Sequence, residues 1–260
     1  MRSVISFIVL SAVALIMCSC GRIVSLTLVQ YNVGVFDKYD SSSVETVADI
    51  IKMMRADVVT LNEVDSCTVR TGKVDQIVSL AHAMGDWSHH YASAMPFGGG
   101  AYGVGVVSRP DLKVLCTDKV ALPRGNGYEP RVMAVVEYKD FIVATVHLDL
   151  TPESRMAQIQ VVNDYFDRMY KDAGKPIFLA GDFNATPDSQ LMAMIQESWT
   201  LLSADDCTYP SHAPDRCIDY IFVRPVRHSI KIKPASSELP DVNLSTASDH
   251  LPVKVTVRIN

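Results

Sequence analysis

The 260-residue sequence lacks several features that would indicate a particular class of protein. It has no excess of positive charge, because 24 Lys and Arg stand against 29 Asp and Glu, so the cationic balance typical of nucleic-acid binding is missing. It contains no HExxH zinc motif, no GxxxxGK[ST] phosphate loop and no internal repeat. With 48% hydrophobic residues and only 13 Gly and 13 Pro, disordered, collagen-like and low-complexity architectures are excluded.

The N-terminus has the pattern of an export signal. Arg2 precedes an uncharged run of 14 residues, 4–17, which is short for a mature membrane span but typical of a signal peptide. Cys20 follows a small residue directly after this run and resembles the lipidated cysteine of a bacterial lipobox. We therefore expect residues 1–20 to be a signal, with a lipid anchor at Cys20 holding the protein on a membrane, facing the periplasm or the exterior. A cleaved signal and soluble secretion, or an uncleaved anchor, are the alternatives.

Four cysteines remain after the signal, at positions 67, 116, 207 and 217. Their spacing fits no zinc site, and disulfides are permitted in an exported protein. Cys207 and Cys217 flank a proline-containing loop and are close enough in sequence to be bridged. Sequence alone leaves open whether they are bridged, because connectivity depends on the fold.

Short β-rich runs alternate with amphipathic segments, and no linker separates them, so we predict one domain over residues 24–260. The expected strands are 24–33, 57–64, 102–108, 131–138, 141–148, 176–182, 218–223 and 251–259. The expected helices are 44–55, with Ser42 and Glu45 as a capping box, 73–84 and 153–170. Several strands are apolar almost throughout, which indicates two covered faces. Either two packed sheets or one parallel sheet between helix layers would explain this.

Polar side chains stand where these apolar strands begin or end. Such positions let a rigid scaffold present side chains into a shared cleft. Each residue alone has an ordinary structural explanation, such as a turn or a strand cap. Their ordered recurrence favours one site containing carboxylates, imidazoles and carboxamides. The candidates are Asn32, Glu63, His147, Asp182, Asn184, Asp219 and the pair Asp249-His250.

The motifs around these residues resemble those of the endonuclease/exonuclease/phosphatase superfamily, which is deoxyribonuclease I-like. They are YNV, LNEVDS, TVHLD, GDFNATPDS, CIDYIFV and SDHLPV, and they span about residues 26–258. GDFN together with SDH is the specific pair. The resemblance implies an α/β (α+β) fold, a four-layer αββα sandwich of two packed mixed sheets, and metal-dependent hydrolysis of phosphate esters.

Phosphate-ester hydrolysis needs a cation, an activated water and stabilisation of the departing oxygen. Mg²⁺ suits such a site because it is hard and needs only one or two carboxylates besides water and substrate; Mn²⁺ is the alternative. With the resemblance as guide, Glu63 is the first expected ligand, and Asn32 and Asp249 lie close to it.

The resemblance also implies roles for the remaining candidates. Asp182 is expected to activate the attacking water, and Asn184 to hold water or phosphate. His250 is expected to donate to a phosphate oxygen, positioned by Asp219, because a carboxylate fixes the imidazole tautomer and raises its basicity. His147 corresponds to the histidine near the leaving group.

Arginines are the expected substrate contacts, because a guanidinium presents a fixed fork of donors to phosphate. Arg70 and Arg155 are the candidates, whereas Arg131 faces either the cleft or a neighbouring carboxylate. Nucleic acid, a sphingomyelin-like lipid head group and a sugar or inositol phosphate all stay open as substrates, and a monomer is assumed. The competing hypothesis is a membrane-tethered binding module that keeps the fold without activity.

Overall fold

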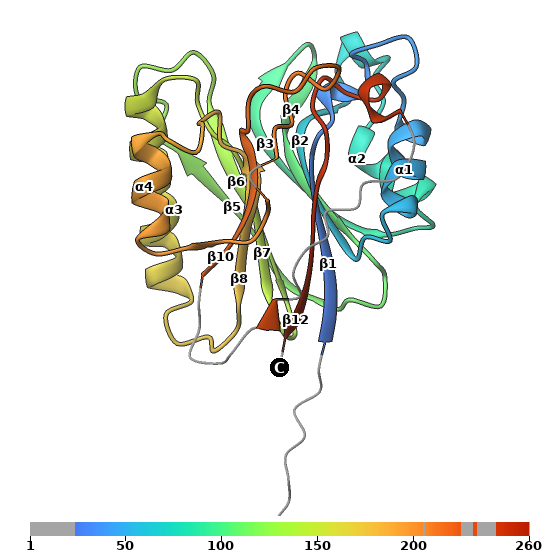
Figure 1. The fold of residues 1–260 in the computed structure, drawn as a ribbon. Helices are drawn as coiled ribbons and strands as arrows, with labels where there is room; N and C mark the ends of the chain where they lie inside the picture. The colour runs from blue at the N-terminus through green and yellow to red at the C-terminus, as the bar shows by residue number, and fades with distance from the viewer. Residues whose placement is uncertain (1–23, 205, 225–230, 233–242, 260) are drawn as a thin grey trace, which may run out of the picture.

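Two six-stranded β-sheets pack face to face, and helices cover the outer side of each (Figure 1). The computed structural model describes residues 24–204, 206–224, 231–232 and 243–259. The signal sequence and Cys20 therefore lie outside the described residues. This arrangement confirms the predicted αββα sandwich and decides between the two architectures that the strand pattern allowed.

The first sheet has β1 and β2 at its centre, running parallel, with antiparallel neighbours on both sides. In spatial order it contains β11 (Lys231–Ile232), β12 (Val253–Ile259), β1 (Val24–Asn32), β2 (Val58–Ser66), β4 (Gly100–Ser108) and β3 (Ser88–Phe97). Because β1 and β2 are parallel, their carboxyl ends reach the same edge of the sheet.

The second sheet repeats this plan around the parallel pair β7 and β8. In spatial order it contains β5 (Val114–Leu122), β6 (Arg131–Tyr138), β7 (Ile142–His147), β8 (Ile177–Asp182), β10 (Asp219–Arg224) and β9 (Thr200–Leu201). The expected strands are therefore present within a few residues of their predicted ends. The loops that follow both parallel pairs lie on the same side of the sandwich (Figure 1).

The helices lie on the outer faces, as their amphipathic patterns require. They are α1 (Val44–Met53), α2 (Gln76–Ala83), α3 (Pro152–Met169) and α4 (Gln190–Gln196). The cap of α1 differs from the prediction, because Ser43 rather than Ser42 accepts a hydrogen bond from the amide of Thr46. Among the described residues, none of these helices is both long and apolar enough to span a bilayer.

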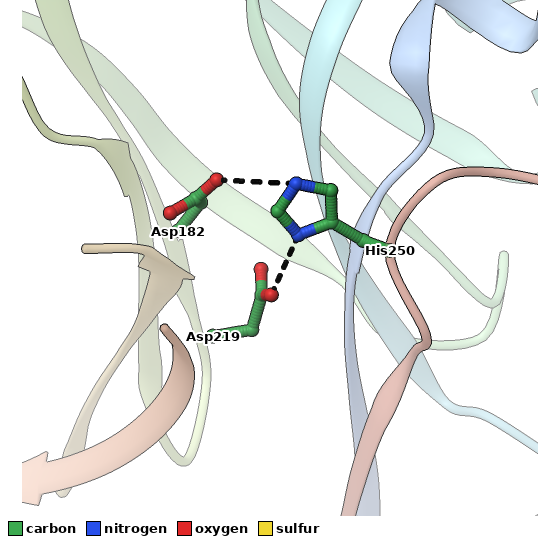
Figure 2. A group of neighbouring side chains, drawn as sticks. All are labelled: Asp182, Asp219 and His250. Carbon is green, nitrogen blue, oxygen red and sulfur yellow. Dashed lines mark hydrogen bonds and ion pairs between the residues drawn. The ribbon is translucent and has the colours of Figure 1, made fainter. Parts of the chain in front are cut away.

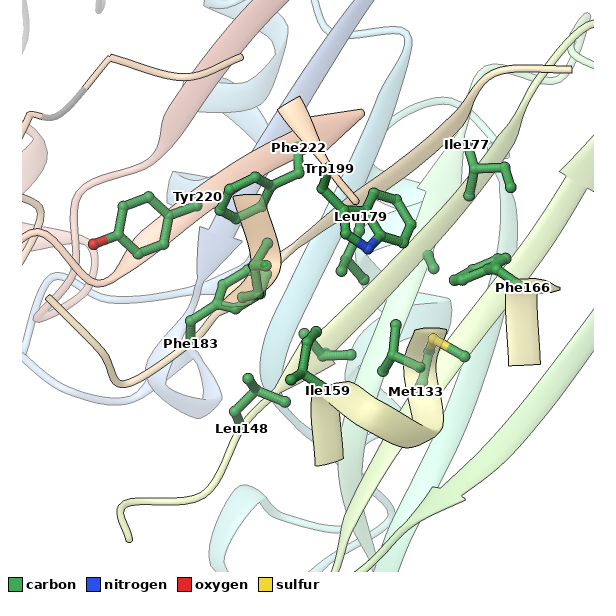
Figure 3. Close-up of a cluster of buried hydrophobic side chains, with 14 of the residues drawn as sticks. Met133, Leu148, Ile159, Phe166, Ile177, Leu179, Phe183, Trp199, Tyr220 and Phe222 are labelled. Carbon is green, nitrogen blue, oxygen red and sulfur yellow. The ribbon is translucent and has the colours of Figure 1, made fainter. Parts of the chain in front are cut away.

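Apolar side chains fill three layers, which explains why the central strands show no alternation. One cluster lies between the sheets and includes Leu28, Val143 and Ile221. A second, with Phe166, Leu179 and Trp199 among its members, joins the second sheet to α3 and α4 (Figure 3). A third joins α1 and α2 to the first sheet. Each central strand is therefore buried on both faces.

The sequence did not reveal the edge strands β3 and β5. These two strands lie at the ends of their sheets. Their side chains are mostly half-buried or exposed, so their hydrophobic pattern is weak. No disulfide joins Cys207 to Cys217 in the part of the chain that the structure describes.

Candidate functional site

Strand register brings the predicted residues together at one edge of the sandwich. In the first sheet, Asn32 at the end of β1 lies beside Asn62 on β2. In the second, Asp182 at the end of β8 lies between His147 on β7 and Asp219 on β10. Residues far apart in sequence thus become neighbours because each ends or begins a strand at this edge.

A β-bulge in β2 changes the direction of the side chain that follows Asn62. The pairing with β4 shifts by one residue between Leu61 and Val64, and Glu63 adopts a left-handed backbone conformation with φ of 54°. Asn62 is fully buried, whereas Glu63 lines a cavity. The extra residue therefore directs Glu63 into the site, a frequent use of bulges.

Asn62 joins the two sheets directly behind the site. Its Oδ1 accepts the backbone N–H of Asp182 at 2.8 Å and also accepts from the Nε2 of Gln30. Its Nδ2 donates to the carbonyl of Val146 at 2.9 Å. A buried carboxamide that is satisfied on both sides fixes its neighbours in place, so Asn62 holds the backbone of Asp182 against the first sheet.

Asn32 lies at the centre of the polar cluster. Its Nδ2 is 3.1 Å from both Glu63 Oε1 and Asp182 Oδ2, and 3.4 Å from His250 Nε2. Its Oδ1 accepts the backbone N–H of Gly34 at 3.2 Å. Asn32 thus presents its amide hydrogens to the carboxylates and orients Glu63 and Asp182. Metal ligation by Asn32 stays a prediction.

Asp182, His250 and Asp219 form a hydrogen-bonded and ion-paired group (Figure 2). His250 Nδ1 is 2.8 Å from Asp219 Oδ2, and His250 Nε2 is 3.7 Å from Asp182 Oδ2. The hydroxyl of Thr208 also donates to Asp219, and the ring of Tyr209 lies 4.8 Å from the imidazole. Asp219 therefore fixes the orientation of His250, as the sequence motif suggested.

Burial and charge shift the protonation equilibria of these groups. Burial and the negative charge of Asp219 raise the pKa of Asp182 to about 7. Burial lowers the pKa of His250, but the charge and hydrogen bond of Asp219 outweigh this and raise it to about 9. Burial and the positive charge of Arg131 hold the pKa of His147 well below its usual value. Near neutral pH, His250 is cationic and His147 is neutral.

The cluster forms one wall of a cavity of about 410 Å³. The lining residues are Lys38, Glu63, Arg70, Met95, Phe97, Tyr102, Glu129, Arg131, His147, Leu150, Asp182, Asn184, Tyr209, Arg216, Ile218, Asp249 and His250. Six of the predicted polar residues reach this surface, whereas Asn32 and Asp219 are buried behind it. Asn184 is held by a bond from its Nδ2 to the carbonyl of Leu148 and has a φ of 48°.

Two carboxylates on one side of the cavity already share a cation. The Nζ of Lys38 is 3.1 Å from Asp249 Oδ2 and 3.6 Å from Glu63 Oε2. The stem of Lys38 lies against Gly34, where a Cβ would come within 2.3 Å of its Cγ. Both carboxylates offer hard oxygen atoms, so this donor set fits a hard divalent ion.

The two predicted arginines are engaged elsewhere. Arg70 lines the cavity, but its guanidinium makes two bonds of 2.7 and 2.8 Å to buried Asp65 and stacks on Phe97. Arg155 does not line the cavity, and it donates instead to the carbonyls of Asp149 and Leu150. Both side chains therefore stabilise loops in the observed structure.

Other cavity residues had no usable sequence signal. Lys38 lies in a loop without a recognisable motif, and Arg216 comes to the site only because the segment after Thr208 folds back against Tyr209. Asn62 precedes Glu63 in LNEVDS, but strand alternation alone would not distinguish which of the two faces the cavity. Arg131 was recognised only as a residue with two available partners.

A sequence profile described as the endonuclease/exonuclease/phosphatase family matches residues 29–250. The chain belongs to this family. The match includes every polar residue of the cluster, from Asn32 to His250, and so agrees with the resemblance carried by the motifs. A sequence search of curated proteins finds no match.

Several solved structures share the fold over nearly their whole length. The mannosyl-6-phosphatase of Bacteroides thetaiotaomicron VPI-5482 is 19% identical, with a TM-score of 0.72 over 89% of this chain and 99% of that one. ANGEL2, a 2′,3′-cyclic phosphatase, is 17% identical, with a TM-score of 0.70 over 90% and 95%. The human nocturnin catalytic domain with bound sulfate is 16% identical, with a TM-score of 0.67 over 91% and 96%. At such identities the comparison establishes the fold.

Proposed function

We propose that this protein hydrolyses phosphate esters with the help of a divalent cation, Mg²⁺ first and Mn²⁺ as the alternative. One observation carries the proposal: the amide of Asn32 lies within 3.4 Å of Glu63, Asp182 and His250 at the wall of a cavity. Such a group combines a cation-binding carboxylate, a proton acceptor and a cationic donor, which this reaction requires.

Glu63 and Asp249 are the residues that would hold the ion. Their oxygens face the same point, where they now contact the ammonium of Lys38. When bound there, a divalent ion would neutralise charge on the phosphate and on the departing oxygen. Asn32 contributes by orienting Glu63 through its amide hydrogens.

Asp182 is the residue that accepts a proton from the attacking water. It is buried, it lines the cavity, and its pKa of about 7 suits proton transfer near neutral pH. The backbone N–H of Asn184 donates to Asp182 Oδ1 at 2.8 Å and fixes the carboxylate plane. The side chain of Asn184 lines the cavity beside it, where it would hold water or a phosphate oxygen.

His250 supplies a positive N–H next to the phosphate, and Asp219 keeps it protonated and oriented. This arrangement favours the negative charge that builds up in the transition state. His147 lies on the other side of Asp182, at 3.6 Å from its Oδ2, and its buried Nδ1 has no hydrogen-bond partner. We assign His147 to the leaving-group side.

The cavity favours a small polar ester over an extended polymer or a lipid. Its volume of about 410 Å³ lies within the range of small-molecule sites, and the chain carries a net charge of −5. The structural likeness to a mannosyl-6-phosphatase points the same way. We therefore place a sugar or inositol phosphate ahead of a lipid head group and of nucleic acid.

A hydrolysis assay tests this proposal. The purified protein is given p-nitrophenyl phosphate, bis-(p-nitrophenyl) phosphate, sugar and inositol phosphates, sphingomyelin and DNA, with Mg²⁺ or Mn²⁺. We expect turnover of at least one ester, with loss of activity after chelation and recovery when metal is restored. A protein that hydrolyses none of these substrates with either metal would instead be the tethered binding module.

The ammonium of Lys38 is expected to compete with the metal. Replacing Lys38 with Met removes a positive charge from between Glu63 and Asp249, and we expect Mn²⁺ affinity to rise about fivefold, as a repulsion of ~1 kcal/mol implies. Isothermal titration calorimetry measures this directly. Lys52→Met is the control, because Lys52 is an exposed helix residue paired with Asp49. Equal Mn²⁺ affinity in wild type and Lys38→Met would contradict the expected competition.

A further inference from the structure

Arg131 is a buried cation whose hydrogen-bonding capacity is not used up within the protein. It begins β6, its exposed fraction is 7%, and it lines the cavity. Its NH2 group is 3.2 Å from Glu129, a carboxylate whose side chain is 44% exposed. Its Nε–H is buried without any partner. A buried donor left unpaired costs free energy, so it needs a specific explanation.

The other arginines of this region do not share this combination. Arg70 also lines the cavity, but its guanidinium is committed to Asp65 through two hydrogen bonds. Arg155 also has an unpartnered Nε, but it does not line the cavity and it binds two backbone carbonyls. Arg131 alone among the three both lines the cavity and has a buried donor without a partner.

Arg131 also lies close to the catalytic group. Strand β6 is the antiparallel neighbour of β7, which ends at His147, and the charge of Arg131 contributes to the low pKa of that histidine. His147 is in turn 3.6 Å from Asp182. An anion placed against Asp182 and His250 would therefore be attracted by the positive charge of Arg131.

We propose that Arg131 binds the phosphoryl group of the substrate through its guanidinium, whose Nε–H has no partner within the protein. The ligand class is a phosphate ester or free phosphate, because a guanidinium offers a planar fork of donors that matches such oxygens. The inference rests on the proposed function. Within the protein, Glu129 is an ion-pair partner of the terminal NH2 group of Arg131.

Binding of inorganic phosphate to the full chain tests this role independently of turnover. Calorimetry in the presence of Mg²⁺ compares wild type with Arg131→Gln, Arg131→Lys, Glu129→Gln and the exposed control Arg168→Gln. We expect the phosphate Kd to rise on the order of tenfold in Arg131→Gln, as the loss of a charged hydrogen bond implies, and less in Arg131→Lys. Glu129→Gln removes a competing carboxylate, so its Kd is expected to stay equal or fall.

The comparison of Glu129→Gln with Arg131→Gln separates a ligand-binding role of Arg131 from a structural one. If Arg131 only anchored Glu129, both Gln variants would weaken phosphate binding equally, and the proposal would be overturned. An unchanged Kd in Arg131→Gln would also overturn it. Thermal unfolding checks that each variant is folded. If Arg131→Gln does not fold, the phosphate Kd of Arg131→Lys decides the question. Phosphate binding that depends on Arg131 in a protein without turnover would refute the proposed hydrolysis while sustaining this inference.

For an active protein, the kinetic constants add a second readout. We expect Arg131→Lys to raise KM for a phosphate ester more than Arg168→Gln does, and to lower kcat/KM. A wild-type value of kcat/KM in both Arg131 variants would overturn the assignment even though hydrolysis itself is confirmed.

Discussion

Asp182→Asn lowers kcat by on the order of a thousandfold, because the side chain that accepts the proton of the attacking water is replaced by one that does not. The size and shape of the residue are preserved, and an oxygen is still available to accept the N–H of Asn184. Steady-state kinetics on the best ester found, with Mg²⁺ or Mn²⁺ at saturation, measures the loss.

Asp188→Asn is the matched control for this experiment. Asp188 lies six residues further along the same segment, outside the cavity, where it accepts a hydrogen bond from the hydroxyl of Thr186. We expect this variant to keep the wild-type kcat. If Asp182→Asn and Asp188→Asn turned over the substrate equally fast, Asp182 would not be the proton acceptor.

Asn62→Leu lowers the free energy of unfolding by about 3–5 kcal/mol, because four buried polar groups lose a partner at once. These groups are the N–H of Asp182, the carbonyl of Val146, the hydroxyl of Thr145 and the Nε2 of Gln30. Urea denaturation with a fixed m-value measures the change.

The same substitution at Asn126, which is exposed in a turn, serves as the control and is expected to change stability by less than about 0.5 kcal/mol. Stability is expected to fall far more on substitution at Asn62, since its side chain hydrogen-bonds the first sheet to the second. A loss at Asn62 no greater than the loss at Asn126 would mean that these bonds contribute little to folding.

The central strands and the order of the site residues could be predicted because both depend on local patterns. Asn32, His147 and Asp182 each end an apolar run, and a run buried on both faces reads as hydrophobic throughout. Strand ends are also where parallel pairing brings distant residues to one edge, so the clustering of these side chains followed from their positions.

The rest depended on tertiary contacts that leave no local trace. The edge strands β3 and β5 are half exposed, so they lack a clear hydrophobic pattern. Lys38 reaches Glu63 and Asp249 only because of the loop conformation around Gly34. The family resemblance, rather than the residue pattern, distinguished two packed sheets from one sheet between helices.

The arginines also show that the partner of a side chain can depend on tertiary contacts. A guanidinium binds phosphate and carboxylate with similar geometry, so sequence cannot say which partner it meets. Arg70 meets Asp65, a carboxylate five residues away that is completely buried. Arg131 meets a carboxylate with one end only. We therefore propose Arg131, rather than Arg70, as the phosphate contact.

The single extra residue in β2 directs Glu63 into the cavity, while its neighbour Asn62 stays buried behind the site. Deleting one residue between Leu61 and Val64 would restore an even alternation and leave no position between Asn62 and Val64 that directs a side chain into the cavity. The site would then lose the carboxylate that Glu63 supplies. Insertions or deletions in this short stretch should therefore disrupt the site, and natural relatives that vary in length are expected to keep its spacing intact.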